Sequence, residues 1–253
     1  MTSRSCPIAT GSGFSLAELA VVLTIVSLLI GGLLVPLTAQ VDLRAAHDTR
    51  QSLAEIREAL LGYAAVKGRL PCPASATTAS NVLGAGSEAF LDAGGLCPNA
   101  AGVLPWATLG VRETDAWGRR YSYRVTSVFA QCVAPPLLTY GTPCTAPSVS
   151  FVLTSLGDLQ VRSVAGGSVI AQQVPAIVVS HGKNGNGAYT PQGTQLPVGT
   201  DADELDNQLT NVGASTANLD FVSKSPTPTF DDEVVWLSPG VLFNRMISVG
   251  RLP

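Results

Sequence analysis

The sequence begins with a long apolar run that follows a short polar start. Residues 19–39 read "LAVVLTIVSLLIGGLLVPLTA" and contain no charged side chain. A helix rises about 1.5 Å per residue, so a run of this length spans roughly 30 Å, the thickness of the hydrocarbon core of a bilayer. The pattern therefore predicts a membrane-spanning helix over residues 14–39.

The hydrophobic pattern becomes amphipathic after this run. Leu53, Ile56 and Leu60 recur at intervals of three and four residues, with polar residues between them. This spacing places the three side chains on one face of a helix. We expect residues 40–67 to continue the same helix, with the apolar face packed on a globular head at 68–253.

Short runs rich in β-branched and aromatic residues follow, bounded by Gly, Pro or Asp. They are "YSYRVTSVF", "SVSFVLTS", "DLQVRSV", "PAIVVS" and "EVVWLS". Such runs predict strands, and their hairpin-like spacing favours an antiparallel sheet. Near the end, Ser238 and Pro239 can start a short helix and Gly250 can end it. The predicted fold is α+β: a long N-terminal helix with a membrane half and an amphipathic half, an antiparallel sheet head and a short C-terminal helix.

Charge and composition exclude two classes of function. Fifteen lysines and arginines stand against eighteen acidic residues, giving a net charge of -3, and the basic residues form no block. Nucleic-acid binding requires a basic patch, so we expect no nucleic-acid partner. The chain has two histidines and no Gly-x-Ser-x-Gly segment. We therefore predict that it is not an enzyme and has no catalytic residues.

Four of the five cysteines follow the apolar run, at Cys72, Cys97, Cys132 and Cys144. They form no C-x-x-C pair and lie near no histidine, which disfavours a zinc site. Two disulfides are the expected alternative, and these imply an oxidising compartment. Three pairings are possible. We favour Cys72 with Cys97 and Cys132 with Cys144, because each pairing closes a short local loop.

The residues in front of the apolar run include a carboxylate that needs an explanation, because charge near a membrane helix usually has a function. The segment "GFSLAE", Gly13 to Glu18, resembles the prepilin signature of type IV pilins and type II secretion pseudopilins. The resemblance implies that a prepilin peptidase cuts between Gly13 and Phe14, removes the leader 1–13 and methylates the amine of Phe14. It also implies that Glu18 pairs with a terminal amine during filament assembly.

Two later segments resemble the major pseudopilin of type II secretion systems. "DAWGRRYSYRV", residues 115–125, is similar to its Trp-Gly segment, with Ala116 in place of a proline. Residues 180–204 are similar to its calcium loop. That resemblance implies calcium as a cofactor, with Asn184, Asp201 and Asp203 as ligands. Asn184 stands where an aspartate is common.

The resemblance implies a structural subunit, a minor pilin or pseudopilin, of a type IV pilus or a type II secretion pseudopilus. Its partners would be other pilin or pseudopilin subunits, the prepilin peptidase, the inner-membrane assembly platform and membrane lipid. It would cross the inner membrane once, with its head in the periplasm, and join a cell-surface filament after assembly. Pilus and pseudopilus, and major and minor subunit, stay open. The alternative is a membrane-anchored periplasmic binding or adhesion module with a pilin-like anchor.

Overall fold

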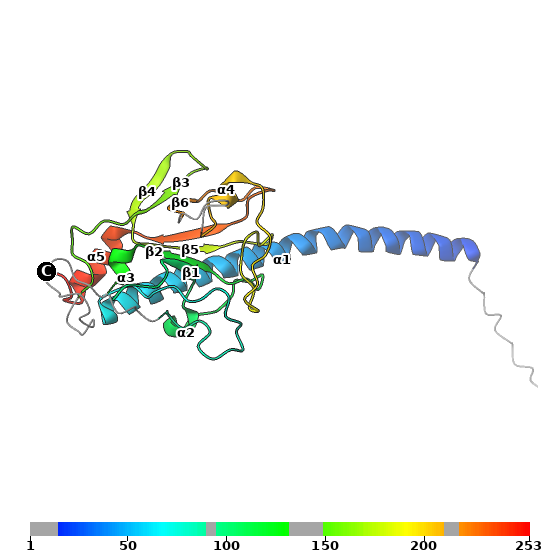
Figure 1. The fold of residues 1–253 in the computed structure, drawn as a ribbon. Coiled ribbons are helices and arrows are strands. Elements are labelled where there is room, and N and C mark those ends of the chain that lie inside the picture. The colour runs from blue at the N-terminus through cyan, green and yellow to red at the C-terminus, as the bar shows by residue number, and fades with distance from the viewer. Residues whose placement is uncertain (1–14, 90–94, 132–148, 210–217) are drawn as a thin grey trace, which may run out of the picture. The chain divides into compact units, whose positions relative to one another are not determined.

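The structure is a computed structural model that describes residues 15–89, 95–131, 149–209 and 218–253 (Figure 1). The chain divides into two compact units, Met1–Arg44 and Ala45–Pro253. The first helix, α1, has the bounds Leu16–Lys67 and therefore contributes to both units. Within α1, the structure describes the side chains of residues 16–30 and 40–67. The sheets and the other helices belong to the second unit.

The expected membrane half of the fold is not found. In the part of the chain that the structure describes, none of the helices has both the length and the apolar composition needed to cross a membrane. The prediction of a membrane-spanning helix over residues 14–39 is therefore wrong, as is the single-pass inner-membrane location derived from it.

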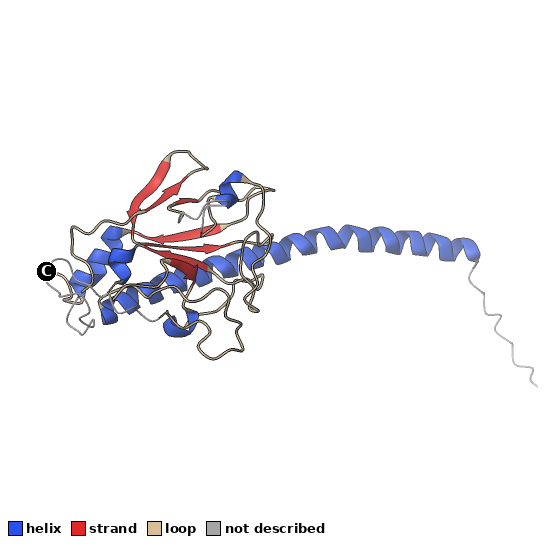
Figure 2. Ribbon diagram, viewed as in Figure 1, coloured by secondary structure: helices blue, strands red, loops and turns tan. Residues whose placement is uncertain are grey.

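The second part of α1, residues 45–67, packs against a four-stranded antiparallel sheet. The strand order is β1 (Ala101–Val103), β2 (Ser122–Val125), β5 (Ala176–Ser180) and β7 (Glu233–Leu237). Figure 2 shows these strands beside the helix. The core contains the three predicted helix side chains and also Leu61 and Ala64 of α1. Residues in and beside the sheet cover them, among them Tyr121, Tyr123, Val125, Val178 and Leu237.

A second sheet covers the other face of the first one. Its order is β4 (Val169–Val174), β3 (Leu159–Arg162) and β6 (Asp220–Val222). Its apolar side chains form a separate core with β5, made of Leu159, Val161, Val174, Phe221, Ile177 and Val179. The strands β3 and β6 are parallel. The prediction of a single antiparallel sheet is therefore wrong, because β6 returns beside β3 only after β4, β5 and α4 have intervened.

The remaining helices are short, apart from the C-terminal one. They are α2 (Trp106–Leu109), α3 (Ser127–Ala130), α4 (Ala202–Leu205) and α5 (Pro239–Ser248). Helix α5 begins at Pro239, the position expected from the sequence, and buries Leu242 and Met246 in the core formed by α1 and the first sheet. Proline suits this first position because the amide hydrogen it lacks would have no partner within the helix.

Arg120 holds the loops at one edge of the first sheet together, although it is completely buried. Its Nε lies 2.8 Å from a carboxylate oxygen of Glu113, and its guanidinium lies 4.6 Å from the ring centre of Trp106. The remaining nitrogens donate hydrogen bonds to the Ser80 hydroxyl and to main-chain oxygens of Ala76, Thr78 and Pro191. A single guanidinium thus joins three loops that are distant in sequence.

Replacing Arg120 with methionine should lower the free energy of unfolding by about 3 kcal/mol, because the change leaves buried oxygens unpaired and Glu113 without its cation. Chemical denaturation of the full chain measures this change. The matched control is Arg112→Met, at an exposed arginine, which should alter stability by less than about 0.5 kcal/mol. Equal stabilities of the two variants would contradict the role assigned to Arg120.

Candidate functional site

The prepilin-like motif lies partly outside the described residues. Gly13 and Phe14 belong to the part that is not described, whereas Glu18 lies in the first turn of α1. The Ser15 amide donates to Glu18 Oε2 at 2.9 Å, and the Glu18 amide donates to Ser15 Oγ at 3.2 Å. This reciprocal pair is a capping box, which satisfies amides at the start of a helix. These hydrogen bonds lower the pKa of Glu18, and the bond from the Ser15 backbone has the largest effect.

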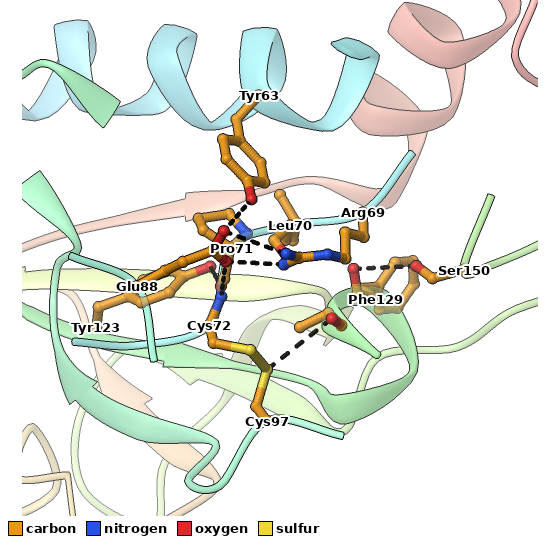
Figure 3. Close-up of a disulfide and its surroundings, with 11 residues drawn as sticks. Tyr63, Arg69, Leu70, Pro71, Cys72, Glu88, Cys97, Tyr123, Phe129 and Ser150 are labelled. Atoms are coloured by element: carbon orange, nitrogen blue, oxygen red, sulfur yellow. Dashed lines mark hydrogen bonds and ion pairs between the residues drawn. A yellow bond between two sulfur atoms is a disulfide. The ribbon is translucent and has the colours of Figure 1, made fainter. Parts of the chain in front are cut away.

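One of the two expected disulfides is present. Cys72 and Cys97 are joined, with their Cα atoms 5.4 Å apart, as Figure 3 shows. The bond fastens the loop that follows α1 to the segment leading into β1. Cys132 and Cys144 lie outside the described residues, so their pairing stays a prediction.

A half-buried carboxylate organises the surroundings of the disulfide. Glu88 accepts hydrogen bonds from both terminal nitrogens of Arg69, from the Tyr63 hydroxyl and from the Cys72 amide (Figure 3). Burial raises the pKa of Glu88, but the bonds from Arg69 and Tyr63 outweigh it and lower the pKa overall. Burial and the bond to Glu88 raise the pKa of Tyr63. Sequence reasoning did not single out Glu88, which lies in a segment without periodicity.

The three predicted calcium ligands do not meet at one point. Asp201 caps α4 by accepting a hydrogen bond from the Asp203 amide at 3.0 Å. Asp203 forms an ion pair with Lys224 and accepts a hydrogen bond from the Ala165 amide. Asn184 instead donates its side-chain amide to Glu204. Asn184 therefore lies beside a different group of acidic side chains from the predicted pair.

That group consists of Glu204, Asp231 and Asp232, and we call it the acidic cluster. One oxygen from each residue lies within 4.8 Å of the others. Glu204 comes from α4, and the two aspartates directly precede β7. Glu204 and Asp232 are 1% and 2% exposed. A turn approaches the cluster closely at Gly182, where φ is +56° and a side chain would come within 2.3 Å of the Asp231 carbonyl oxygen.

Side-chain amides donate hydrogen bonds to three carboxylate oxygens of the acidic cluster. The side-chain amides of Asn184 and Asn186 donate to the two oxygens of Glu204, and that of Asn207 donates to Asp232 Oδ2. Buried Oδ1 atoms of Asp231 and Asp232 have no hydrogen-bond partner among the described residues. Burial raises the pKa of Asp232 well above its usual range, and the charges of Glu204 and Asp231 add to this effect.

These features suit a bound cation. Closely spaced carboxylates with unpaired oxygens repel one another, and a hard divalent cation such as calcium takes six to eight oxygen ligands. The three side chains of the acidic cluster offer only oxygen atoms as metal ligands, which favours calcium or magnesium over zinc. The sequence signal was the pair of adjacent aspartates before a strand, in "FDDEVVW". It was missed because nothing local to that segment indicates its proximity to Glu204.

A buried Ser-His-Asp arrangement adjoins the acidic cluster. Ser122 Oγ lies 2.8 Å from His181 Nε2, and His181 Nδ1 lies 3.8 Å from Asp232 Oδ1. Burial lowers the pKa of His181 to about 4. A catalytic serine must contact its substrate, but Ser122 is only 1% exposed. The three side chains connect three places in the fold: Ser122 lies in β2, His181 directly follows β5 and Asp232 directly precedes β7. In this conformation they offer no accessible nucleophile.

Comparison with known proteins gives no match to any family model, curated protein or solved structure. The resemblance to pilins and pseudopilins therefore depends on the motifs in the sequence.

Removing the Cys72–Cys97 disulfide by Cys72→Ala with Cys97→Ala should lower the free energy of unfolding by about 3 kcal/mol, on the chain-entropy model for a loop of this length. Chemical denaturation measures the loss, and Cys6→Ser is the control that should leave stability unchanged.

Peptide mapping without reduction should also yield a Cys132–Cys144 peptide. A peptide that joins Cys97 to Cys132 would contradict both pairings.

Proposed function

We propose that this chain is a structural subunit of a filament, a minor pilin or pseudopilin of a type IV pilus or a type II secretion pseudopilus. The observation that carries the proposal is the exposure of apolar side chains in the first part of α1, residues 16–30. Ten of its large apolar side chains are 43% to 87% exposed, namely Leu16, Leu19, Val21, Val22, Leu23, Ile25, Val26, Leu28, Leu29 and Ile30. A helix that is apolar on all sides is stable only when other groups cover it.

Copies of the same helix are the covering groups in this proposal. Each fully buried Leu, Ile or Val side chain contributes about 1.5 to 3 kcal/mol, so even partial cover of these ten side chains favours strong association. Association through this segment leaves the second unit, which has its own cores, available at the surface of the fibre.

The capping box gives Glu18 a defined position for assembly. Cleavage after Gly13 would start the mature chain at Phe14, one residue before the Ser15 amide that donates to Glu18. The Glu18 carboxylate would then lie close to the new terminus of its own helix, where an amine of the same or a neighbouring copy can pair with it. Pairing compensates the charge as the helices pack together, because an unpaired carboxylate in an apolar core is costly.

Replacing Glu18 with glutamine should prevent entry of the chain into filaments. Glutamine retains a side-chain oxygen for the capping box but cannot form an ion pair with an amine. The measurement is mass spectrometry of sheared surface filaments, compared with total cell protein; we expect at least a tenfold loss from the filament fraction. The same spectra should show a mature chain that begins with N-methylated Phe14.

Ser15→Ala is the matched control, since it removes the hydroxyl of the capping box and leaves the Glu18 charge in place. That variant should enter filaments. If Glu18→Gln assembles like the unmodified chain, Glu18 serves only to cap the helix and the assembly role is wrong. If the chain is instead a binding module with a pilin-like anchor, both the unmodified chain and Glu18→Gln would be absent from filaments.

We also propose that the acidic cluster binds calcium in the second unit. Glu204, Asp231 and Asp232 would supply the carboxylate oxygens, in place of Asp201 and Asp203. The unpaired buried oxygens of the two aspartates support this assignment. The presence of Asn184 rather than aspartate fits the same picture, because its amide can donate to Glu204, whereas a further carboxylate would add repulsion.

Calcium should raise the melting temperature of the full chain relative to the same protein in chelator. A ligand that binds only the folded state at 100 times its Kd adds about 2.7 kcal/mol of stability. Asp231→Asn with Asp232→Asn should abolish the difference. These changes should not destabilise the chelated protein, because they remove like charges from a buried cluster.

Asp201→Asn is the control, since asparagine also caps helices well and this residue lies outside the acidic cluster. It should keep the full calcium effect. A melting temperature that is the same in millimolar calcium and in chelator would refute the cation site, whereas loss of the effect in Asp201→Asn alone would favour the ligands predicted from the sequence.

A further inference from the structure

Among the described residues, strand β1 is the terminal strand of the first sheet. In the antiparallel ladder with β2, Ala100 accepts from the Val125 amide and Leu104 donates to the Tyr121 carbonyl. Residues that point toward β2 alternate with those that point away, so Ala101 and Val103 direct their N–H and C=O groups outward. Val103 exchanges both of its hydrogen bonds with Ala74. Ala101 has no such partner among the described residues.

The chain that pairs with Val103 turns away before it reaches Ala101. Ala74 and Val103 form an antiparallel bridge, so a continued ladder would place Ala76 opposite Ala101. Instead the Ala76 carbonyl accepts a hydrogen bond from Arg120 at 3.0 Å. Gly102 allows the close approach at the start of this divergence, because a side chain there would lie 2.5 Å from the Ala74 carbonyl oxygen.

The divergence opens a cavity of about 330 Å³ beside Ala101. Its size is at the lower end of the range for ligand sites, which suits a short segment and not a folded domain. No described residue that lines it is charged. The polar lining consists of side-chain amides, hydroxyls and one phenol ring, from Asn99, Gln195, Ser75, Thr77 and Tyr189.

We propose that this cavity binds an uncharged, extended peptide segment, which adds to the sheet opposite Ala101, in the position that a continued ladder would give to Ala76. An outward N–H and C=O on one residue form the pattern that the main chain of an antiparallel strand satisfies with two hydrogen bonds. The lining offers no counter-charge, so an ionised side chain of the peptide would lose its hydration without compensation. Small and polar uncharged side chains fit the amides and hydroxyls of the cavity.

The test uses the immobilised full chain and a library of pentapeptides with acetylated and amidated ends, built from Ala, Ser, Thr, Asn, Gln, Val, Leu and Tyr. Mass spectrometry identifies the peptides that are retained. Ala101→Pro should reduce retention at least tenfold, because it removes the outward N–H. Proline is tolerated at the first residue of an edge strand, and the ladder with β2 does not use this N–H group.

Thr77→Trp is a second variant, which fills the cavity from an exposed position and should also prevent retention. Leu83→Trp adds the same ring at a fully exposed site that does not line the cavity, and it should retain peptides normally. Equal retention by the unmodified chain, Ala101→Pro and Thr77→Trp would overturn the proposal. Retention of neutral mono- or disaccharides, with no peptide retained, would assign the cavity to sugars and overturn it as well.

Discussion

The apolar contact between the second part of α1 and the first sheet is the interaction on which the rest of this fold depends. The helix stripe that includes Leu53, Ile56 and Leu60 covers one face of the sheet, and the second sheet covers the other. Strand β5 lies between these layers and is buried along its whole length. Its end therefore carries Ser180 and His181 into the interior, where polar groups need partners. Ser180 donates to Asp115 and His181 contacts Ser122.

The acidic cluster lies just beyond this buried strand end, and its neighbours are mainly amides. Asparagine can donate a hydrogen bond to a carboxylate without bringing a charge of its own. Asn184, Asn186 and Asn207 do so here. Neutral donors stabilise individual carboxylate oxygens but leave the mutual repulsion of the three carboxylates in place. A folded state with this arrangement gains stability from any cation that binds between them, so that folding and cation binding are coupled.

Local patterns predicted some elements well, and contacts distant in sequence account for most of the errors. The stripe on α1, the start of α5 at Pro239 and the Cys72–Cys97 disulfide follow from spacing or from a short loop. The parallel pairing of β3 with β6 does not, because short apolar runs carry no information about which strand lies beside them. The acidic cluster was missed for the same reason: Glu204 and Asp231 are brought together by α4 and β7, and no motif spans them. The membrane prediction extended one composition pattern over residues 14–39, and the described part of the helix does not support it.

The disulfide after α1 also sets how far the second unit can be stretched. Cys72 and Cys97 are separated by 25 positions in the sequence, and an extended chain spans about 3.4 Å per residue. Without the bond, a pulling force could release roughly 85 Å of chain between these two points. With the disulfide formed, the chain between the two cysteines cannot be extended. The tension then passes through the sulfur atoms, directly from the end of α1 to the strand β1. Under load the second unit would then extend little at this point until a covalent bond is broken.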